Sequence, residues 1–209
     1  MRAYSDNPAR EESAREPIDL HRVRLARRRR RGPGCEPGYR NSGWTLEVDF
    51  DEDVYSIKAR EQDEAGAMML GRVSYQAFSA VWPQMDDEFP RYNAMPKYVV
   101  STTLAEGDLV EGWGTTTILR TLDEVAAVKE AEPAPILVHG SATLARNLSD
   151  AGLIDRYHLL VFPFVLGAGK RMWSDTDKPR QTLELVESEA YPNGVHKLVY
   201  DVREFDPDG

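Results

Sequence analysis

The stretch that decides the fold is "ILVHGSATLARNLSDAGLIDRYHLLVFPFVLGAGKRMW", residues 136–173. It opens with a short apolar run that ends in glycine, which is typical of a buried strand. The next segment, 141–152, spaces Leu144 and Leu148 on one helical face and stops at a glycine. A second apolar run follows over 156–167. The stretch therefore predicts a strand, a connecting helix and a further strand.

The same alternation is repeated on the amino-terminal side. Apolar spacing predicts helices over 51–66 and 72–82, with a buried strand, 67–71, between them. Residues 97–104 are rich in β-formers, and 115–132 read as a short strand followed by a helix with an S/T-x-x-E capping box. Strands that alternate with helices imply right-handed crossovers, so we expect a mainly parallel sheet with helices on both faces.

The carboxyl-terminal end has a different pattern. Residues 182–205 form two alternating runs around Pro192, Asn193 and Gly194, which predicts an antiparallel hairpin. The chain has 209 residues, 41% of them hydrophobic, which is enough for one core. We therefore expect a single α/β domain over 36–209, a three-layer α/β/α fold whose central, mostly parallel sheet ends in this hairpin.

Charge is unevenly distributed along the sequence. The net charge is -9, yet residues 1–31 hold ten arginines against five acidic residues. A run of like charges with few aromatic residues predicts a disordered or aberrant basic segment over 1–35. Because the rest of the chain would repel phosphate backbones, the balance disfavours a nucleic-acid-binding protein. A basic arm that binds nucleic acid remains the less favoured alternative.

Other classes of function lack their sequence signals. There is no apolar run of about 18 residues and no secretory h-region, so we expect a cytoplasmic protein without a membrane span. The four histidines are scattered without zinc-ligand spacing, and no metal site is predicted. Cys35 is the single cysteine, with no local cue for a catalytic base. The sequence names no catalytic residue.

Two junctions between a strand and a helix carry residues that suit a phosphate site. In an open α/β sheet, ligands bind at the carboxyl ends of the strands, beside helix N-termini. One junction offers a glycine, an arginine and a first-turn hydroxyl, and the other a glycine followed by two hydroxyls. These residues are Gly71, Arg72 and Ser74, and Gly140, Ser141 and Thr143. Ordinary turn and N-cap chemistry explains either junction alone, but their joint occurrence favours binding of a dinucleotide.

Three blocks of sequence carry a family resemblance over about 36–205. "AMMLGRVSYQAFSAVWP" (67–83), "NAMPKYVVSTTL" (93–104) and the opening stretch resemble the dihydrofolate reductase-like family that includes the C-terminal reductase domain of the riboflavin-biosynthesis protein RibD. The resemblance implies an NADPH-dependent reductase. It would transfer hydride to a small heterocycle of the pteridine or riboflavin-pathway aminopyrimidine type. A non-catalytic nucleotide-binding protein of the same fold is the alternative.

The resemblance also assigns residues to the site. Arg72 and its neighbours would hold phosphate, 101–102 would lie near the adenosine ribose phosphate, and 140–144 would cradle the pyrophosphate. The implied cofactor-binding residues are Gly71, Arg72, Val73, Ser74, Ser101, Thr102, Gly140, Ser141, Ala142, Thr143, Leu144, Gly167 and Gly169. Tyr39 and Trp44 are candidates for a wall of the substrate pocket, although packing over the sheet explains such aromatic residues equally well. A homodimer is expected from the family and from the apolar run "HLLVFPFV", residues 158–165.

The amino-terminal segment departs from the family, which begins with a buried apolar strand and a loop containing L-D-G. Here that place holds "DLHRVRLARRRRRGPGC", residues 19–35. A parallel strand buried on both faces is nearly continuously hydrophobic, so these arginines do not suit it. One allowed codon choice for the same residues reads, in the next frame, as "TSTVFVSLDGVVEAPG". We hypothesise a compensated pair of frameshifts, with in-frame sequence resuming at about Glu36. The chain as written would then bind NADPH weakly and turn over little.

Overall fold

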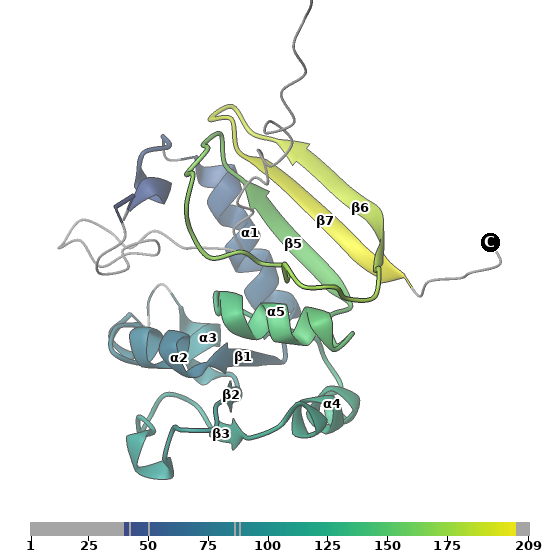
Figure 1. Ribbon diagram of the computed structural model, residues 1–209. Helices are drawn as coiled ribbons and strands as arrows, with labels where there is room; N and C mark the ends of the chain where they lie inside the picture. Colours follow the sequence, from purple (N-terminus) through teal and green to yellow (C-terminus); the bar gives the residue numbers. More distant parts are fainter. Residues whose placement is uncertain (1–39, 42, 50, 86, 88, 204–209) are drawn as a thin grey trace, which may run out of the picture.

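The structure, a computed structural model, describes residues 40–41, 43–49, 51–85, 87 and 89–203 (Figure 1). The helices are α1 (Glu52–Glu64), α2 (Arg72–Ser79), α3 (Pro90–Ala94), α4 (Leu122–Ala131) and α5 (Ala142–Asp150), with short 3-10 helices η2 (Trp44–Leu46), η3 (Trp82–Gln84) and η4 (Glu106–Asp108). The strands are β1 (Ala67–Gly71), β2 (Lys97–Val100), β3 (Thr116–Leu119), β4 (Ile136–Val138), β5 (Arg156–Val161), β6 (Thr182–Ala190) and β7 (His196–Arg203). The predicted alternation of strands and helices is confirmed.

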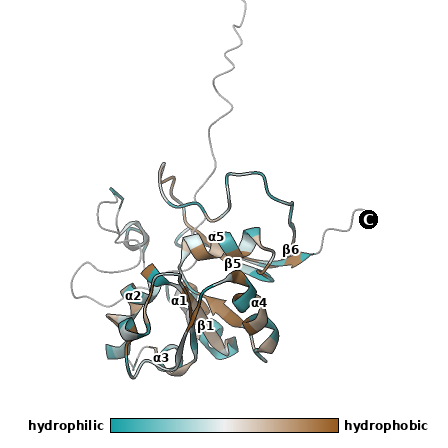
Figure 2. Cartoon of the chain, turned by 60° about the horizontal axis from the view of Figure 1, so that its bottom comes forward, coloured by the Kyte–Doolittle hydropathy of each residue, from teal (hydrophilic) through white to brown (hydrophobic). Residues whose placement is uncertain are grey.

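Strands β1 to β4 form a parallel sheet in the order β3-β2-β1-β4. Side chains of β1 alternate between its two faces. Met68 packs in a cluster with Tyr75 of α2 and Trp82, whereas Met69 packs with Leu144 and Leu148 of α5. Hydrophobic residues concentrate on these strands, and the surrounding helices mix hydrophilic and hydrophobic residues (Figure 2). The expected layers of helices on both faces of the parallel sheet are therefore present.

Local hydrogen bonds define where the helices begin. The Asp51 carboxylate accepts from the backbone N–H groups of Asp53 and Val54 at the start of α1. At α4, the Thr121 hydroxyl accepts from the backbone of Glu124, as the capping-box pattern predicts. The Glu124 carboxylate returns to the backbone N–H of Arg120 instead of the N-cap residue. The glutamate therefore bonds the residue before the N-cap, one position further from the helix than a capping box requires.

The carboxyl-terminal hairpin is confirmed, but the strand before it corrects one expectation. β6 and β7 pair antiparallel, and Gly194, with φ +84°, supplies the left-handed residue of their turn. β5 was expected to extend the parallel sheet, yet it pairs antiparallel with β7 in a second sheet of order β5-β7-β6. It also ends at Val161 and not at 167, since Pro163 has no N–H to donate to a ladder.

Two other predicted elements are shorter than expected. The helix predicted over 72–82 ends at Ser79, and η3 follows as a separate turn around Pro83. The strand predicted over 97–104 ends at Val100. In the described part of the chain no helix is both long and apolar enough to cross a bilayer.

A lysine lies inside the core beneath the parallel sheet. Lys97 on β2 is fully buried, and its Nζ donates to the carbonyl oxygens of Asn93 and Met95, each at 3.0 Å. The same Nζ lies 4.6 Å from the centroid of the Trp113 ring. These contacts tie the end of α3 to β2. Burial lowers the pKa of Lys97 to about 8.

This shift predicts a pH dependence of stability. The unfolded chain keeps the proton of Lys97 up to the ordinary pKa near 10.5, whereas the folded chain releases it above about 8. The unfolded state therefore binds more protons between these values, and this group raises stability with pH by up to about 1.4 kcal/mol per unit. Urea unfolding of the native chain and of Lys97→Met, at pH 8 and pH 10, measures the effect. Equal changes in the two chains would contradict it.

Candidate cofactor site

Four strand ends lie in a row at one edge of the parallel sheet. The strands all run in one direction, so the residues at or just after their carboxyl ends follow the strand order β3-β2-β1-β4. These residues are Arg120, Ser101, Gly71 and His139. Because β1 and β4 are neighbours, the two predicted glycine junctions lie beside each other. This edge is where open α/β sheets bind their ligands.

The two glycine junctions touch directly. The backbone N–H of Gly71 donates to the Oγ of Ser141 at 3.0 Å. The Ser141 hydroxyl in turn donates to the carbonyl oxygen of His139 at 3.4 Å. A side chain from the loop before α5 thereby fixes the start of α2. The structure thus brings together residues that lie 70 positions apart in the sequence.

The loop before α5 adopts a strained backbone. Gly140 has φ +63°, and Ser141 follows with φ +59° and ψ +47°. Ser141 is the one non-glycine residue with positive φ among the residues that the structure describes. The left-handed conformation costs a residue with a Cβ about 1–2 kcal/mol. Strain of this kind clusters at ligand sites, where a precise turn is required.

Both helices begin without a side-chain cap. Gly71 has no side chain, and the Ser141 hydroxyl contacts Gly71 rather than the first turn of its own helix. The first N–H groups of α2 and α5 have no partner within their helices. Together with the positive end of each helix dipole they favour an anion. The phosphates of a dinucleotide fit these donors.

The backbone of the loop before α5 comes close to α2 at Gly140. A Cβ added at Gly140 would lie 3.6 Å from the Oγ of Ser74 and 3.5 Å from the Cζ of Phe78. Gly140 therefore lies against α2 as well as α5. A side chain there would press against Ser74 and Phe78, so glycine lets the loop before α5 approach α2 this closely.

Arg72 and Val73 open the first turn of α2 and face solvent. Arg72 is exposed, and its Nη1 donates to the Oε1 of Gln76 at 3.2 Å. Val73 is 65% exposed. An exposed arginine at a helix start can turn to a phosphate without leaving a buried partner unpaired.

The segment after β2 is shaped by Ser101. Its Oγ accepts from the backbone N–H groups of Thr103 and Leu104, at 3.2 and 2.9 Å, so this hydroxyl stabilises a turn. Thr102 is exposed in that turn. Sequence reasoning missed Arg120, whose Nη1 donates to the carbonyl oxygen of Ser101 at 2.7 Å. Arg72 and Arg120 therefore flank the Ser101 segment, one from each neighbouring strand end.

The other predicted residues follow β5 of the second sheet, precede α1, or lie outside the described chain. Gly167 and Gly169 follow β5 with positive φ, and an added Cβ at Gly167 would lie 3.3 Å from the Arg40 guanidinium. Trp44 is 7% exposed and packs edge-on against Phe162, with ring centroids 5.0 Å apart. That burial favours a packing role for Trp44. Tyr39 lies outside the described residues.

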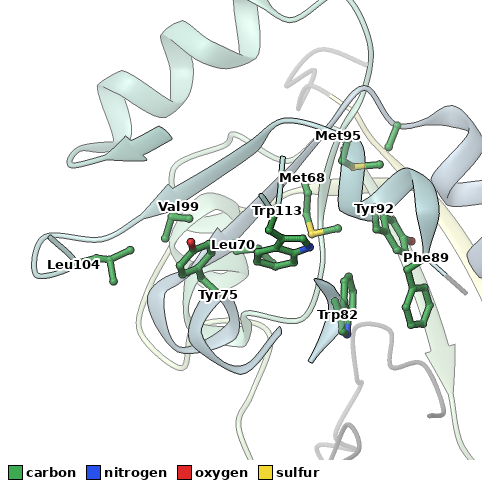
Figure 3. Packing of buried hydrophobic residues seen from close by; sticks show 11 residues of the cluster. Met68, Leu70, Tyr75, Trp82, Phe89, Tyr92, Met95, Val99, Leu104 and Trp113 are labelled. Atoms are coloured by element: carbon green, nitrogen blue, oxygen red, sulfur yellow. The ribbon is translucent and has the colours of Figure 1, made fainter. Parts of the chain in front are cut away.

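A cluster of packed aromatic residues lies beside the start of α5 and against α2. Trp82 stacks on Phe78 of α2 at 4.4 Å and on Tyr92 at 5.4 Å between ring centroids. His139, just after β4, is 2% exposed and lies 5.5 Å from the Trp82 ring. Figure 3 shows Trp82, Phe89 and Tyr92 gathered beside Met68. The packing fixes α2 against the end of β4.

No group of three or more metal-ligating side chains is found among the described residues. The donors at the sheet edge are instead backbone N–H groups, hydroxyls and guanidinium groups. Such a set suits phosphate oxygens rather than a metal ion.

Comparison with known proteins places this geometry in a family. The family model "RibD C-terminal domain" matches residues 38–197. The uncharacterized protein YyaP of Bacillus subtilis is 28% identical over 144 residues, which cover 66% of this chain and 74% of that protein. The residues matched by the family model, 38–197, include both glycine junctions.

Solved structures agree on the fold. A protein of Shewanella sp. PV-4, proposed to act in riboflavin biosynthesis, has a TM-score of 0.60 at 18% identity, covering 77% of this chain and 87% of its own. A pyrimidine reductase-like protein of Corynebacterium diphtheriae has 0.51 at 13%, covering 75% and 83%. RibD of Acinetobacter baumannii has 0.53 at 12%, covering 74% of this chain and 51% of that one. The architecture is the dihydrofolate reductase-like fold that the sequence predicts, and the chain belongs to the RibD C-terminal domain family.

Proposed function

We propose that the chain is an NADPH-dependent reductase of the riboflavin pathway type, acting on a small heterocycle such as an aminopyrimidine or a pteridine. The observation that carries the proposal is the Gly71 to Ser141 hydrogen bond, which joins the starts of two helices at one sheet edge. The family membership supports a reductase-like role. The structurally similar protein of Corynebacterium diphtheriae, which is named pyrimidine reductase-like, supports the substrate class.

The chain's own residues would bind and orient the cofactor. The first N–H groups of α2 and α5 would hold the pyrophosphate, with Gly140 leaving room for it. Arg72 and the exposed Thr102 would face the ribose 2′-phosphate. When bound, NADPH would supply the hydride, and the protein would orient the substrate and exclude water.

Removal of the Arg72 guanidinium tests cofactor choice. We expect Arg72→Ala to weaken NADPH binding about 10- to 100-fold, because a hydrogen bond to a charged group contributes about 1.5–3 kcal/mol. Binding of NADH should be unchanged, since it lacks the 2′-phosphate. Fluorescence titration with both cofactors measures the two dissociation constants. Arg91→Ala is the matched control, because Arg91 is also exposed but pairs with Asp63 away from the sheet edge.

Equal loss of NADPH and NADH affinity in Arg72→Ala would contradict the assignment of this residue, and so would equal binding of both cofactors by the native chain.

A nucleotide-binding protein without turnover is the second candidate. Oxidation of NADPH with a panel of pteridines, aminopyrimidines and flavin precursors separates the two. A homodimer remains part of the proposal.

A further inference from the structure

The tip of the last hairpin holds the one asparagine in the sequence that precedes a glycine. The tip lies between β6 and β7 and consists of Tyr191, Pro192, Asn193, Gly194 and Val195. The backbone nitrogen of the residue after an asparagine can attack the side-chain amide. A glycine in that place has no Cβ to hinder the approach. The sequence of the tip therefore suits loss of the Asn193 amide.

Backbone hydrogen bonds close the tip into a tight turn. The N–H of Gly194 donates to the carbonyl oxygen of Tyr191 at 2.9 Å, and the N–H of Tyr191 donates to the carbonyl oxygen of Val195 at 2.8 Å. Pro192 occupies the second position of this turn, where its fixed φ favours the closed form. The nitrogen that would attack is thus held by the turn. The turn must open before this nitrogen can reach the side chain of Asn193.

Both polar atoms of the Asn193 side chain also have partners. Its Oδ1 accepts from the backbone N–H of Val195 at 3.1 Å. Its Nδ2 donates to the carbonyl oxygen of Asp49 at 3.0 Å, across 144 positions of sequence. Asp49 lies two residues before Asp51, whose carboxylate caps α1. Asn193 therefore ties the hairpin tip to the segment from which α1 begins.

The base of the hairpin is fixed, whereas its tip reaches solvent. Tyr191 and Val195 are 6% and 0% exposed and belong to the apolar cluster against α1. Pro192 and Gly194 are exposed, and Asn193 between them is half-buried. Opening can therefore be confined to residues 192–194 while the cluster stays packed. Such local openings need far less free energy than global unfolding.

We propose that Asn193 is a site of spontaneous deamidation, and that opening of the hairpin tip from Asp49 controls its rate. In the opened tip the backbone nitrogen of Gly194 loses its proton and attacks Cγ of Asn193. A C–N bond forms, the bond from Cγ to Nδ2 breaks, and Nδ2 takes up a proton and leaves as ammonia. Water then hydrolyses the succinimide at either carbonyl and gives aspartate or isoaspartate. No atom is oxidised or reduced in these steps.

The reaction changes the contact between the hairpin and the start of α1. A carboxylate has no hydrogen to donate, so the bond to the carbonyl oxygen of Asp49 is lost. The new charge also faces an acidic segment, because residues 47–53 include five aspartates and glutamates. Like charges repel, and the segment before α1 is released from the tip. The proposal rests neither on the reductase activity nor on the basic segment 1–35, which lies outside the described residues.

The rate is tested on full-length chains at pH 8, with peptide mapping by mass spectrometry at residue 193. We expect the folded native chain to deamidate about tenfold or more slowly than the same chain unfolded in guanidinium chloride, because opening breaks the turn bond and both side-chain bonds. In Pro192→Ala the opened turn gains backbone freedom, so the folded chain should react about two- to fivefold faster than the native one. Each folded rate is divided by the unfolded rate of the same variant, which removes the intrinsic effect of the substitution.

Pro179→Ala is the matched control, because Pro179 is also exposed but lies in the loop between β5 and β6. Its ratio of folded to unfolded rates should equal that of the native chain. Equal ratios in Pro192→Ala and the native chain would overturn control by the turn, and so would equal rates in the folded and unfolded native chain. Faster deamidation at another asparagine would overturn the site. A product that contains aspartate but no isoaspartate would overturn the succinimide route.

Release of the α1 segment is tested with two variants of Asn193. Asn193→Asp reproduces one product, and Asn193→Ala removes the same bond to Asp49 without adding charge. We expect amide hydrogen exchange at 47–49 and 52–54 to be about fivefold faster in Asn193→Asp than in the native chain. Asn193→Ala should lie between them, and its difference from Asn193→Asp should shrink at high salt, because salt screens the repulsion. Equal exchange in Asn193→Asp and the native chain would overturn the release.

Discussion

Replacement of Trp113 with alanine is expected to lower the free energy of unfolding by about 4 kcal/mol. Trp113 is fully buried, and its Nε1 donates to the Oδ1 of Asn93 at 2.8 Å. Asn93 also donates from Nδ2 to the carbonyl oxygen of Trp82 at 2.9 Å. The ring of Trp113 lies 5.6 Å from that of Tyr75 and beneath the Nζ of Lys97. Truncation therefore removes apolar contacts within the cluster that Figure 3 shows around Trp113. It also leaves the buried amide oxygen of Asn93 without its indole donor.

Denaturant unfolding of three variants separates these contributions. Trp113→Phe keeps most of the ring but removes the indole N–H, so we expect it to lose roughly 1–3 kcal/mol from the hydrogen bond and the smaller ring. Trp173→Ala is the control, because Trp173 is only partly buried, beside Tyr157. Its loss should be smaller than that of Trp113→Ala. Equal losses in the two alanine variants would show that the Trp113 cluster does not hold the core.

The succession of helices and strands along the chain could be predicted because local residues determine it. Thr121 caps α4 through a side-chain contact three residues away, and the turn of the last hairpin follows from a glycine at positive φ. Strand ends were harder to predict. β2 stops at Val100 because the Ser101 hydroxyl draws the next backbone N–H groups into a turn, and a β-rich composition does not reveal that contact.

The pairing of β5 was the part of the fold that the sequence did not determine. The apolar pattern of β5 suits a parallel or an antiparallel neighbour equally, and the structure pairs it with β7. The choice depends on tertiary contacts, among them Leu160 with Val54 and Ile57 of α1. Local patterning has no access to such contacts between distant segments.

The candidate site was predictable where it lies at a strand end followed by a helix. Gly71 and Ser141 were named from that context, and the structure adds their hydrogen bond. Arg120 was missed because it belongs to no motif and is brought beside Ser101 only by the pairing of β2 with β3. Its position after a strand that adjoins β2 was the signal that could have found it.

Gly140 offers the largest expected effect on cofactor binding. We expect Gly140→Leu to weaken NADPH binding by about 100-fold or more, equivalent to roughly 2.7 kcal/mol. The added side chain would begin 3.6 Å from the Oγ of Ser74 and extend over the junction of α2 and α5. It would also place a Cβ in the left-handed region, at a cost of about 1–2 kcal/mol in stability. A control must therefore carry the same backbone strain without touching the site.

Gly152 provides that control, because it follows the opposite end of α5 with φ +68° and an added Cβ would meet no atom within 4 Å. Gly152→Leu should lose stability much as Gly140→Leu does, since both adopt nearly the same φ, yet it should bind NADPH like the native chain. Thermal unfolding and fluorescence titration of both variants, at a temperature where each is folded, measure the two quantities separately. Equal NADPH affinities in the two variants would remove Gly140 from the cofactor site, because backbone strain alone would then account for any change.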